Sequence, residues 1–132
     1  TKVSFNGVSA NFTVVTDTYM TAKVPSGATK GAVTVLDGSG TLLTSSKIFV
    51  VVPNLISFNP TSGPVSSSVV LTGTGLTQAA KVTFGGVNAT VFTVNSDSQI
   101  TASVPTGAKT GKIAVTTPGG TSASSATFTV TP

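Results

Sequence analysis

Only three side chains in this sequence carry a carboxylate, and they are Asp17, Asp37 and Asp97. Acid–base catalysis needs titratable groups held within hydrogen-bond reach of one another. Asp17 and Asp97 fall at equivalent positions of two sequence copies, so a carboxylate pair inside one domain is not expected. Because His and Cys are absent, a Ser-His-Asp triad and a thiol nucleophile are excluded. We predict that the chain is not an enzyme, and that each Asp hydrogen-bonds the backbone of its own turn.

The segment Asp37-Gly38-Ser39-Gly40 is the one stretch that resembles a cation loop. A Ca²⁺ site usually combines several oxygen ligands with more than one carboxylate. This segment offers one carboxylate, and it aligns with the turn sequence Thr117-Pro118-Gly119-Gly120 of the second copy. No phosphate-binding Gly-x-x-x-x-Gly-Lys-[Ser/Thr] motif is present. The sequence therefore predicts an ordinary turn here, with no metal and no cofactor.

Sugar-binding surfaces are usually built from exposed aromatic rings. The chain has no Trp and a single Tyr, Tyr19, whose counterpart in the second copy is Gln99. Most Phe side chains fall at inward positions of the expected strands. Tyr19 is therefore the candidate ligand-binding residue, and a partly exposed aromatic at a strand edge is the alternative.

Two Asn-x-Thr sequons begin at Asn11 and Asn88, in nearly equivalent loops. They are candidate glycosylation sites if the protein is secreted by a eukaryote, and accidental matches if it is bacterial.

The net charge of +4 comes from seven Lys and three Asp. Nucleic-acid binding proteins usually concentrate Lys and Arg in a basic stripe, whereas these lysines are scattered and Arg is absent. We therefore expect no nucleic-acid partner. The longest apolar run, Ile48–Val52, is far too short to span a membrane.

An internal repeat organises the whole chain. The segment Lys2–Ala10 matches Lys81–Ala89, and after a one-residue slip Phe12–Val14 matches Phe92–Val94. The match continues through further pairs: Asp17 with Asp97, Thr21-Ala22 with Thr101-Ala102, Val24-Pro25 with Val104-Pro105, Gly31 with Gly111, Gly40-Thr41 with Gly120-Thr121, and, after a compensating slip, Phe49 with Phe128. We predict two domains, an incomplete copy over 1–53 and a complete copy over 54–132.

The complete copy shows short runs of alternating apolar residues between Gly- and Pro-rich turns. This pattern is typical of an antiparallel β-sandwich, and no segment has the apolar period of a helix. Seven strands are expected, with these inward residues: Ile56 and Phe58, Val69 and Leu71, Val82 and Phe84, Phe92 and Val94, Ile100 to Val104, Ile113 and Val115, Phe128 and Val130.

Several blocks of the complete copy resemble the IPT/TIG family of Ig-like domains (immunoglobulin-like, plexins, transcription factors). They are Ile56–Pro64 with its Pro-x-Ser-Gly turn, Val69–Leu76 with its Gly-x-Gly corner, Val82–Gly86, Asp97–Pro105, and Thr117–Thr121, which is similar to bacterial surface repeats. The resemblance implies an all-β fold of tandem Ig-like (E-set) antiparallel sandwiches, the first lacking its first two strands. It also implies an extracellular or cell-surface setting.

The family hosts several functions, and fold alone does not choose among them. The main hypothesis is a structural spacer, stalk or fibre-forming repeat of a multi-repeat surface protein. The alternative is a non-catalytic binding or adhesion module for polysaccharide or a surface protein. A DNA-binding regulator comes third.

The incomplete copy lacks the two strands that supply Ile56, Phe58, Val69 and Leu71 in the complete one. At about 1.5–3 kcal/mol per buried side chain, their loss removes about 6–12 kcal/mol, which is comparable with the stability of a small domain. Three explanations follow: the chain is an excerpt of a longer array, the open face packs on a neighbouring repeat, or another subunit donates the strands.

Overall fold

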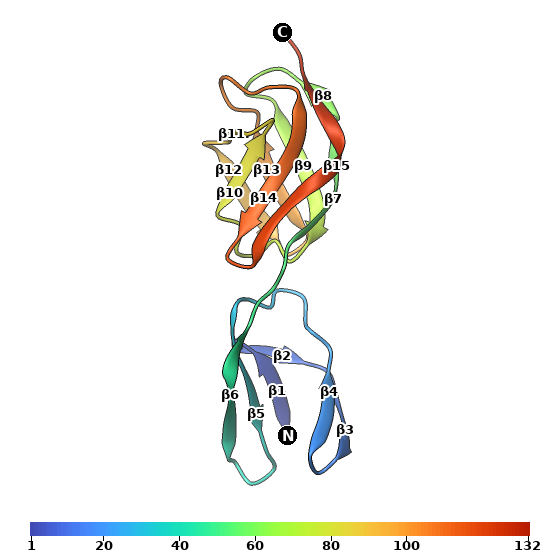
Figure 1. The fold of residues 1–132 in the computed structure, drawn as a ribbon, viewed down its shortest axis with the longest axis vertical. Coiled ribbons are helices and arrows are strands. Elements are labelled where there is room, and N and C mark those ends of the chain that lie inside the picture. Colours follow the sequence, from blue (N-terminus) through green and yellow to red (C-terminus); the bar gives the residue numbers. More distant parts are fainter. The chain divides into compact units, whose positions relative to one another are not determined.

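A computed structural model describes all residues, 1–132, and every regular element in it is a β-strand. The chain divides into two compact units, Thr1–Val51 (unit 1) and Val52–Pro132 (unit 2). The all-β prediction is confirmed. Each unit is built from β-strands that pair mainly in antiparallel fashion (Figure 1).

Unit 2 is a sandwich of two sheets (Figure 1). One sheet has the order β11-β10-β14-β15-β8, and the other has the order β12-β13-β9-β7. The pairing of β8 with β15 is parallel, and the other neighbours are antiparallel. The strands are β7 (Asn54–Asn59), β8 (Ser62–Gly63), β9 (Ser68–Thr74), β10 (Lys81–Phe84), β11 (Val87–Asn88), β12 (Phe92–Ser96), β13 (Gln99–Ser103), β14 (Gly111–Thr117) and β15 (Gly120–Val130).

The core of unit 2 lies between its two sheets. Because side chains alternate across a strand, one apolar face of each strand points inward. Phe128 is fully buried and makes edge-to-face contacts with Phe84 (ring centroids 5.3 Å apart) and Phe58 (6.0 Å). The other core side chains are Leu55, Val69, Leu71, Leu76, Val82, Ala89, Ile100, Ala102, Val104, Ile113 and Val115.

The prediction that Ile56 of β7 is a core residue is wrong. Ile56 is 57% exposed, whereas its neighbour Leu55 is buried. The register between β7 and β9 shifts between Leu55 and Ser57, so an unpaired residue is inserted at Ile56. Such a bulge changes which side chains face the core. Phe58, beyond the bulge, is buried as the alternation predicts.

Unit 1 contains six strands in two sheets. They are β1 (Lys2–Phe5), β2 (Val8–Ala10), β3 (Phe12–Thr16), β4 (Tyr19–Ala22), β5 (Gly31–Leu36) and β6 (Leu42–Phe49). The larger sheet has the order β2-β1-β5-β6, and β3 pairs with β4 alone.

The first hairpin of each unit has the same turn. Asn6 (φ 46°) and Gly7 (φ 88°) connect β1 to β2, and Gly85 (φ 56°) and Gly86 (φ 86°) connect β10 to β11. Two successive positive φ angles are typical of a type I′ turn, which favours Asn-Gly and Gly-Gly. The turn therefore explains why two different dipeptides stand at one repeat position.

The strand registers of the two units agree with the internal sequence repeat. Thr16 of β3 lies opposite Tyr19, as Ser96 of β12 lies opposite Gln99, and both pairs follow a register shift at the same place. The one-residue slip in the repeat alignment before Phe12 corresponds to an extra residue of unit 2, Thr90, which precedes β12. The second slip lies inside the β5–β6 turn: five residues separate the paired Leu36 and Leu42, whereas four separate the equivalent pair Thr116 and Thr121.

Unit 1 has no counterpart of β7 or β9. Its buried core is correspondingly small and consists of Val3, Phe5 and Ala28. Phe49, the counterpart of Phe128, packs edge-to-face on Phe5 at 4.9 Å but stays partly exposed. The first sandwich therefore lacks the two strands that complete the second.

Candidate functional site

Tyr19 is the one exposed aromatic side chain, with 59% of its surface accessible. It begins β4 and lies opposite Thr16 of β3. The next residue, Met20, packs against the core of unit 1. Because side chains alternate along a strand, Tyr19 points to the outer face of the β3–β4 pair. The ring therefore presents a flat apolar surface to solvent.

A hollow of about 370 Å³ adjoins Tyr19 in unit 1. The carboxylates of Asp17 and Asp37, three threonine side chains and several apolar side chains line it, so it combines hydrogen-bonding groups with apolar surface. Its lining is Thr1, Val14, Thr16, Asp17, Thr18, Tyr19, Met20, Val35, Asp37 and Leu43.

Asp37 belongs to the turn between β5 and β6. Its Oδ1 accepts hydrogen bonds from Ser39 N (2.9 Å), Ser39 Oγ (2.6 Å) and Thr41 N (2.9 Å). The hydroxyl of Ser39, followed by the backbone of Thr41, lowers the pKa of Asp37 below its ordinary value. The structure confirms the turn predicted for this segment. No three acidic, His or Cys side chains gather at one place in the chain.

The carboxylate of Asp97 reaches a second loop, which the sequence interpretation did not anticipate. Its oxygens accept hydrogen bonds from Thr77 Oγ1 (2.7 Å) and from Gly75 N (3.4 Å), both between β9 and β10. The backbone carbonyl of Asp97 also accepts from Leu76 N (3.0 Å). Asp97 therefore holds the loop that follows β9. Its counterpart Asp17 has no such loop in unit 1.

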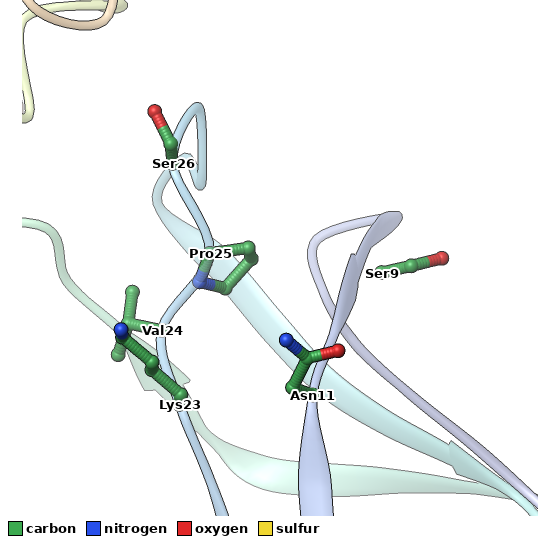
Figure 2. A pocket seen from close by; sticks show the side chains of 6 residues that line it. All are labelled: Ser9, Asn11, Lys23, Val24, Pro25 and Ser26. Carbon is green, nitrogen blue, oxygen red and sulfur yellow. The ribbon is translucent and has the colours of Figure 1, made fainter.

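A second hollow, of about 290 Å³, lies near the other end of β4 (Figure 2). Here the chain leaves β4 beside the start of β3, and Lys23 N donates to Asn11 O at 2.9 Å. The lining combines polar groups with the apolar Val24, which is 42% exposed. Sequence reasoning marked Asn11 of this lining as a sequon but did not predict the hollow, because the sequon motif does not indicate one. The lining residues are Ser9, Asn11, Lys23, Val24, Pro25 and Ser26.

Both sequon asparagines are exposed. Asn11 lies between β2 and β3, and Asn88 ends β11. The side chains are therefore accessible to a modifying enzyme, and glycosylation stays a prediction that an intact-mass measurement checks.

Comparison with family models decides the relationship of the chain. Residues 53–130 match the model of the IPT/TIG domain. The chain belongs to the IPT/TIG family. The match confirms the resemblance carried by the turn and corner motifs of unit 2. No curated protein sequence matches the chain.

Solved structures similar to this IPT/TIG protein include bacterial surface proteins. A surface glycan-binding protein from Prevotella bryantii matches with a TM-score of 0.63 and 15% identity, over 96% of this chain and 33% of that one. SGBP-B from a complex xyloglucan utilization locus in Bacteroides uniformis matches with a TM-score of 0.55 and 17% identity, over 98% and 41%.

A similar match is found outside bacterial proteins. The full extracellular region of plexin A4 matches with a TM-score of 0.57 and 21% identity, over 98% of this chain and 14% of that one. The chain spans less than half the length of each of these three proteins. At these identities the likeness shows the fold, an array of Ig-like domains. The structure contains no helix long and apolar enough to cross a membrane.

Proposed function

We propose that the chain is a non-catalytic polysaccharide-binding module of a cell-surface protein. The observation that carries the proposal is the likeness of nearly the whole chain to two bacterial proteins, the surface glycan-binding protein from Prevotella bryantii and SGBP-B from the xyloglucan utilization locus in Bacteroides uniformis. Two further facts agree with a non-catalytic role: the chain has no His, Cys or Glu, and no three acidic side chains gather at one place, although Asp17 and Asp37 line the same hollow.

Tyr19 is the residue we propose to contact the sugar. A pyranose ring has a flat face of C–H groups that stacks on an aromatic ring, and Tyr combines that apolar face with a polar hydroxyl. The neighbouring hydroxyls of Thr16 and Thr18 lie 3.4 Å apart and are exposed. They provide hydrogen-bonding groups beside the ring, as small-ligand sites usually do.

Affinity electrophoresis in gels containing xyloglucan tests this proposal. The wild-type chain should migrate more slowly in the polysaccharide gel than in a plain gel. Tyr19→Ala should weaken retention about tenfold or more, since a tenfold change corresponds to about 1.4 kcal/mol. Tyr19→Phe should keep most of it. Gln99→Ala, at the matching position of unit 2, is the control and should not change migration.

Two results would contradict the proposal. One is migration that the polysaccharide leaves unchanged although the chain is folded by circular dichroism. The other is retention that Tyr19→Ala and Gln99→Ala reduce equally. Incubated xyloglucan should also keep its chain length, since we propose no hydrolysis.

A spacer or stalk is the second candidate function, and the lack of exposed aromatic side chains in unit 2 favours it. Unit 2 presents no exposed aromatic ring, and its Phe58, Phe84 and Phe128 are buried in its own core. Such a unit contributes length rather than a ligand surface. A folded chain that no tested polysaccharide retains would favour this function.

A further inference from the structure

The core of unit 1 is open along one side. Positions that are fully buried in unit 2 are exposed at their counterparts: Val104 is 1% exposed, whereas Val24 is 42% exposed. Ile100 is likewise fully buried, whereas its counterpart Met20 is only partly so. By contrast, Val3 on β1 is as buried as its counterpart on β10. The loss of burial includes β4 and extends to β5 and β6, where Val33, Val35 and Phe49 are only partly buried although their counterparts Ile113, Val115 and Phe128 are fully buried.

In unit 2, the corresponding side is covered by β9. There β13 pairs with β12 on one edge and with β9 on the other, with Ile100 opposite Leu71 and Ala102 opposite Val69. In unit 1, β4 pairs with β3 alone (Figure 1). The second edge of β4 therefore presents unpaired backbone N–H and C=O groups, which is a template for another strand.

The two hollows of unit 1 mark the two ends of the same uncovered path. Val24 lines the hollow of Figure 2, and its counterpart in unit 2 is Val104. The backbone carbonyl of Val104 accepts a hydrogen bond from Ser66 N (2.8 Å), and the backbone N–H of Val104 donates one to Ser67 O (2.9 Å). Both serines belong to the turn that enters β9.

At the hollow beside Tyr19, the counterpart of Asp17 is Asp97. Asp97 binds Gly75 and Thr77 of the loop that leaves β9. The segment that contains β9 thus occupies, in unit 2, the places that are hollow at both ends of β4.

We propose that the open side of unit 1 is a docking site for an extended segment with the sequence pattern of β7–β9. The segment adds antiparallel to the free edge of β4, in the register that β9 has with β13. Its inward apolar residues, at the positions of Val69 and Leu71, cover Ala22 and Met20. Its Gly-Leu-Thr loop binds the carboxylate of Asp17. The strand covers the edge and the inner face, whereas the Tyr19 ring points to the outer face. The loop of the segment nevertheless enters the hollow that Tyr19, Thr16 and Thr18 also line, so docking of the segment and sugar binding at Tyr19 share this end of unit 1.

The sequence pattern of the docking segment follows from the apolar surface of unit 1 that the segment must bury. A peptide that adds to a sheet edge gains affinity from main-chain hydrogen bonds and specificity from alternate side chains. The site requires apolar residues at alternate positions, as in β9, where Val69 and Leu71 are buried and Thr72 is exposed. A second copy of the chain pairing β4 with β4 would leave the inner core uncovered.

A fusion tests the proposal with the full chain. A second copy of residues 54–79 is placed directly before Thr1, which reproduces the connection of β9 to β10 in unit 2. Amide hydrogen exchange of Met20–Ala22 should slow by at least about 100-fold, because an unprotected edge strand becomes a central one. In the added copy only, Leu71→Asp should abolish this protection, whereas the matched Thr72→Asp should retain it.

The register has its own test, because the natural chain contains no Cys. In the fusion, Met20→Cys together with Leu71→Cys in the added copy should form a disulfide, since residues directly opposite in a sheet have adjacent Cβ atoms. Thr21→Cys with the same partner should not, because its side chain faces the other way.

Three results would overturn the proposal: unchanged exchange of Met20–Ala22 in the fusion, equal effects of Leu71→Asp and Thr72→Asp, or protection of these amides in the unfused chain through dimer formation, measured by light scattering.

Discussion

Replacing Phe128 by Ala should remove a large share of the stability of unit 2. The side chain is fully buried and contacts the rings of Phe58 and Phe84, which come from both sheets. Burying and packing a Phe of this kind contributes about 3–5 kcal/mol, including the cavity left behind. A small domain is stable by about 5–15 kcal/mol, so the loss is a large share of the total.

The matched variant is Phe49→Ala in unit 1. Phe49 occupies the same repeat position but is partly exposed and contacts a single ring, that of Phe5. Water already reaches it, so we expect a loss of about 1–2 kcal/mol, less than half of that at Phe128. Ile56→Ala, at the exposed bulge of β7, should change stability by less than about 0.5 kcal/mol.

Thermal unfolding followed by residue-resolved NMR measures each unit separately. For a domain of this size, about 4–8 °C of midpoint is lost per kcal/mol, so Phe128→Ala should lower the midpoint of unit 2 by about 12–40 °C. Equal losses for Phe128→Ala and Phe49→Ala would refute the conclusion that the two cores are covered to different degrees. A large loss for Ile56→Ala would refute the bulge assignment.

Three further predictions follow from the side-chain and backbone contacts. Asp97→Ala should destabilise unit 2 by about 1–3 kcal/mol, because its carboxylate accepts hydrogen bonds from the β9–β10 loop, whereas the matched Asp17→Ala should cost less than about 0.5 kcal/mol in urea unfolding. Ser39→Ala should raise the pKa of Asp37 toward its ordinary value of about 3.9 in an NMR titration. Because the pKa of Asp37 is depressed in the folded state, the contribution of Asp37 to stability is present above the ordinary pKa and is lost as the pH falls through the folded pKa. If Ser39→Ala left the pKa of Asp37 unchanged, the hydroxyl of Ser39 would not be the cause of the depression. Gly73→Ala should destabilise the β7–β9 pairing by about 1–3 kcal/mol, because the added methyl would overlap the backbone of β7, and faster amide exchange in β9 is the measurement.

Much of the fold could be predicted from the sequence because the chain repeats itself. Matching positions such as Phe12 with Phe92 have the same strand partners in both units, Ala22 and Ala102. Alternation identified the main strands of unit 2 because one face of each packs on the core between the sheets. It failed at Ile56, since a bulge depends on how β7 fits β9 and leaves no mark in the spacing of apolar residues.

The candidate site was only partly predictable. Tyr19 was found because it is the only Tyr and its counterpart is polar, and its exposure agrees with that interpretation. The hollow beside Val24 was missed, since the one motif in its lining, the sequon at Asn11, gives no sign of a hollow. The role of Asp97 was also missed, because its hydrogen-bond partner Thr77 is 20 residues away in sequence and the two are brought together only by the completed sandwich.

The β3–β4 hairpin has the same register and the same irregularity as β12–β13, although no β9 lies beside it. The geometry of this hairpin is therefore encoded locally, by its own residues and turn. Local hairpins close rapidly, whereas pairing β9 with β13 requires a longer loop to close. In unit 2, folding should accordingly begin in the hairpins, and β9 should join late. Leu71→Ala would then accelerate unfolding much more than it slows folding, so the strand that covers the core controls how long the folded unit lasts rather than how fast it forms.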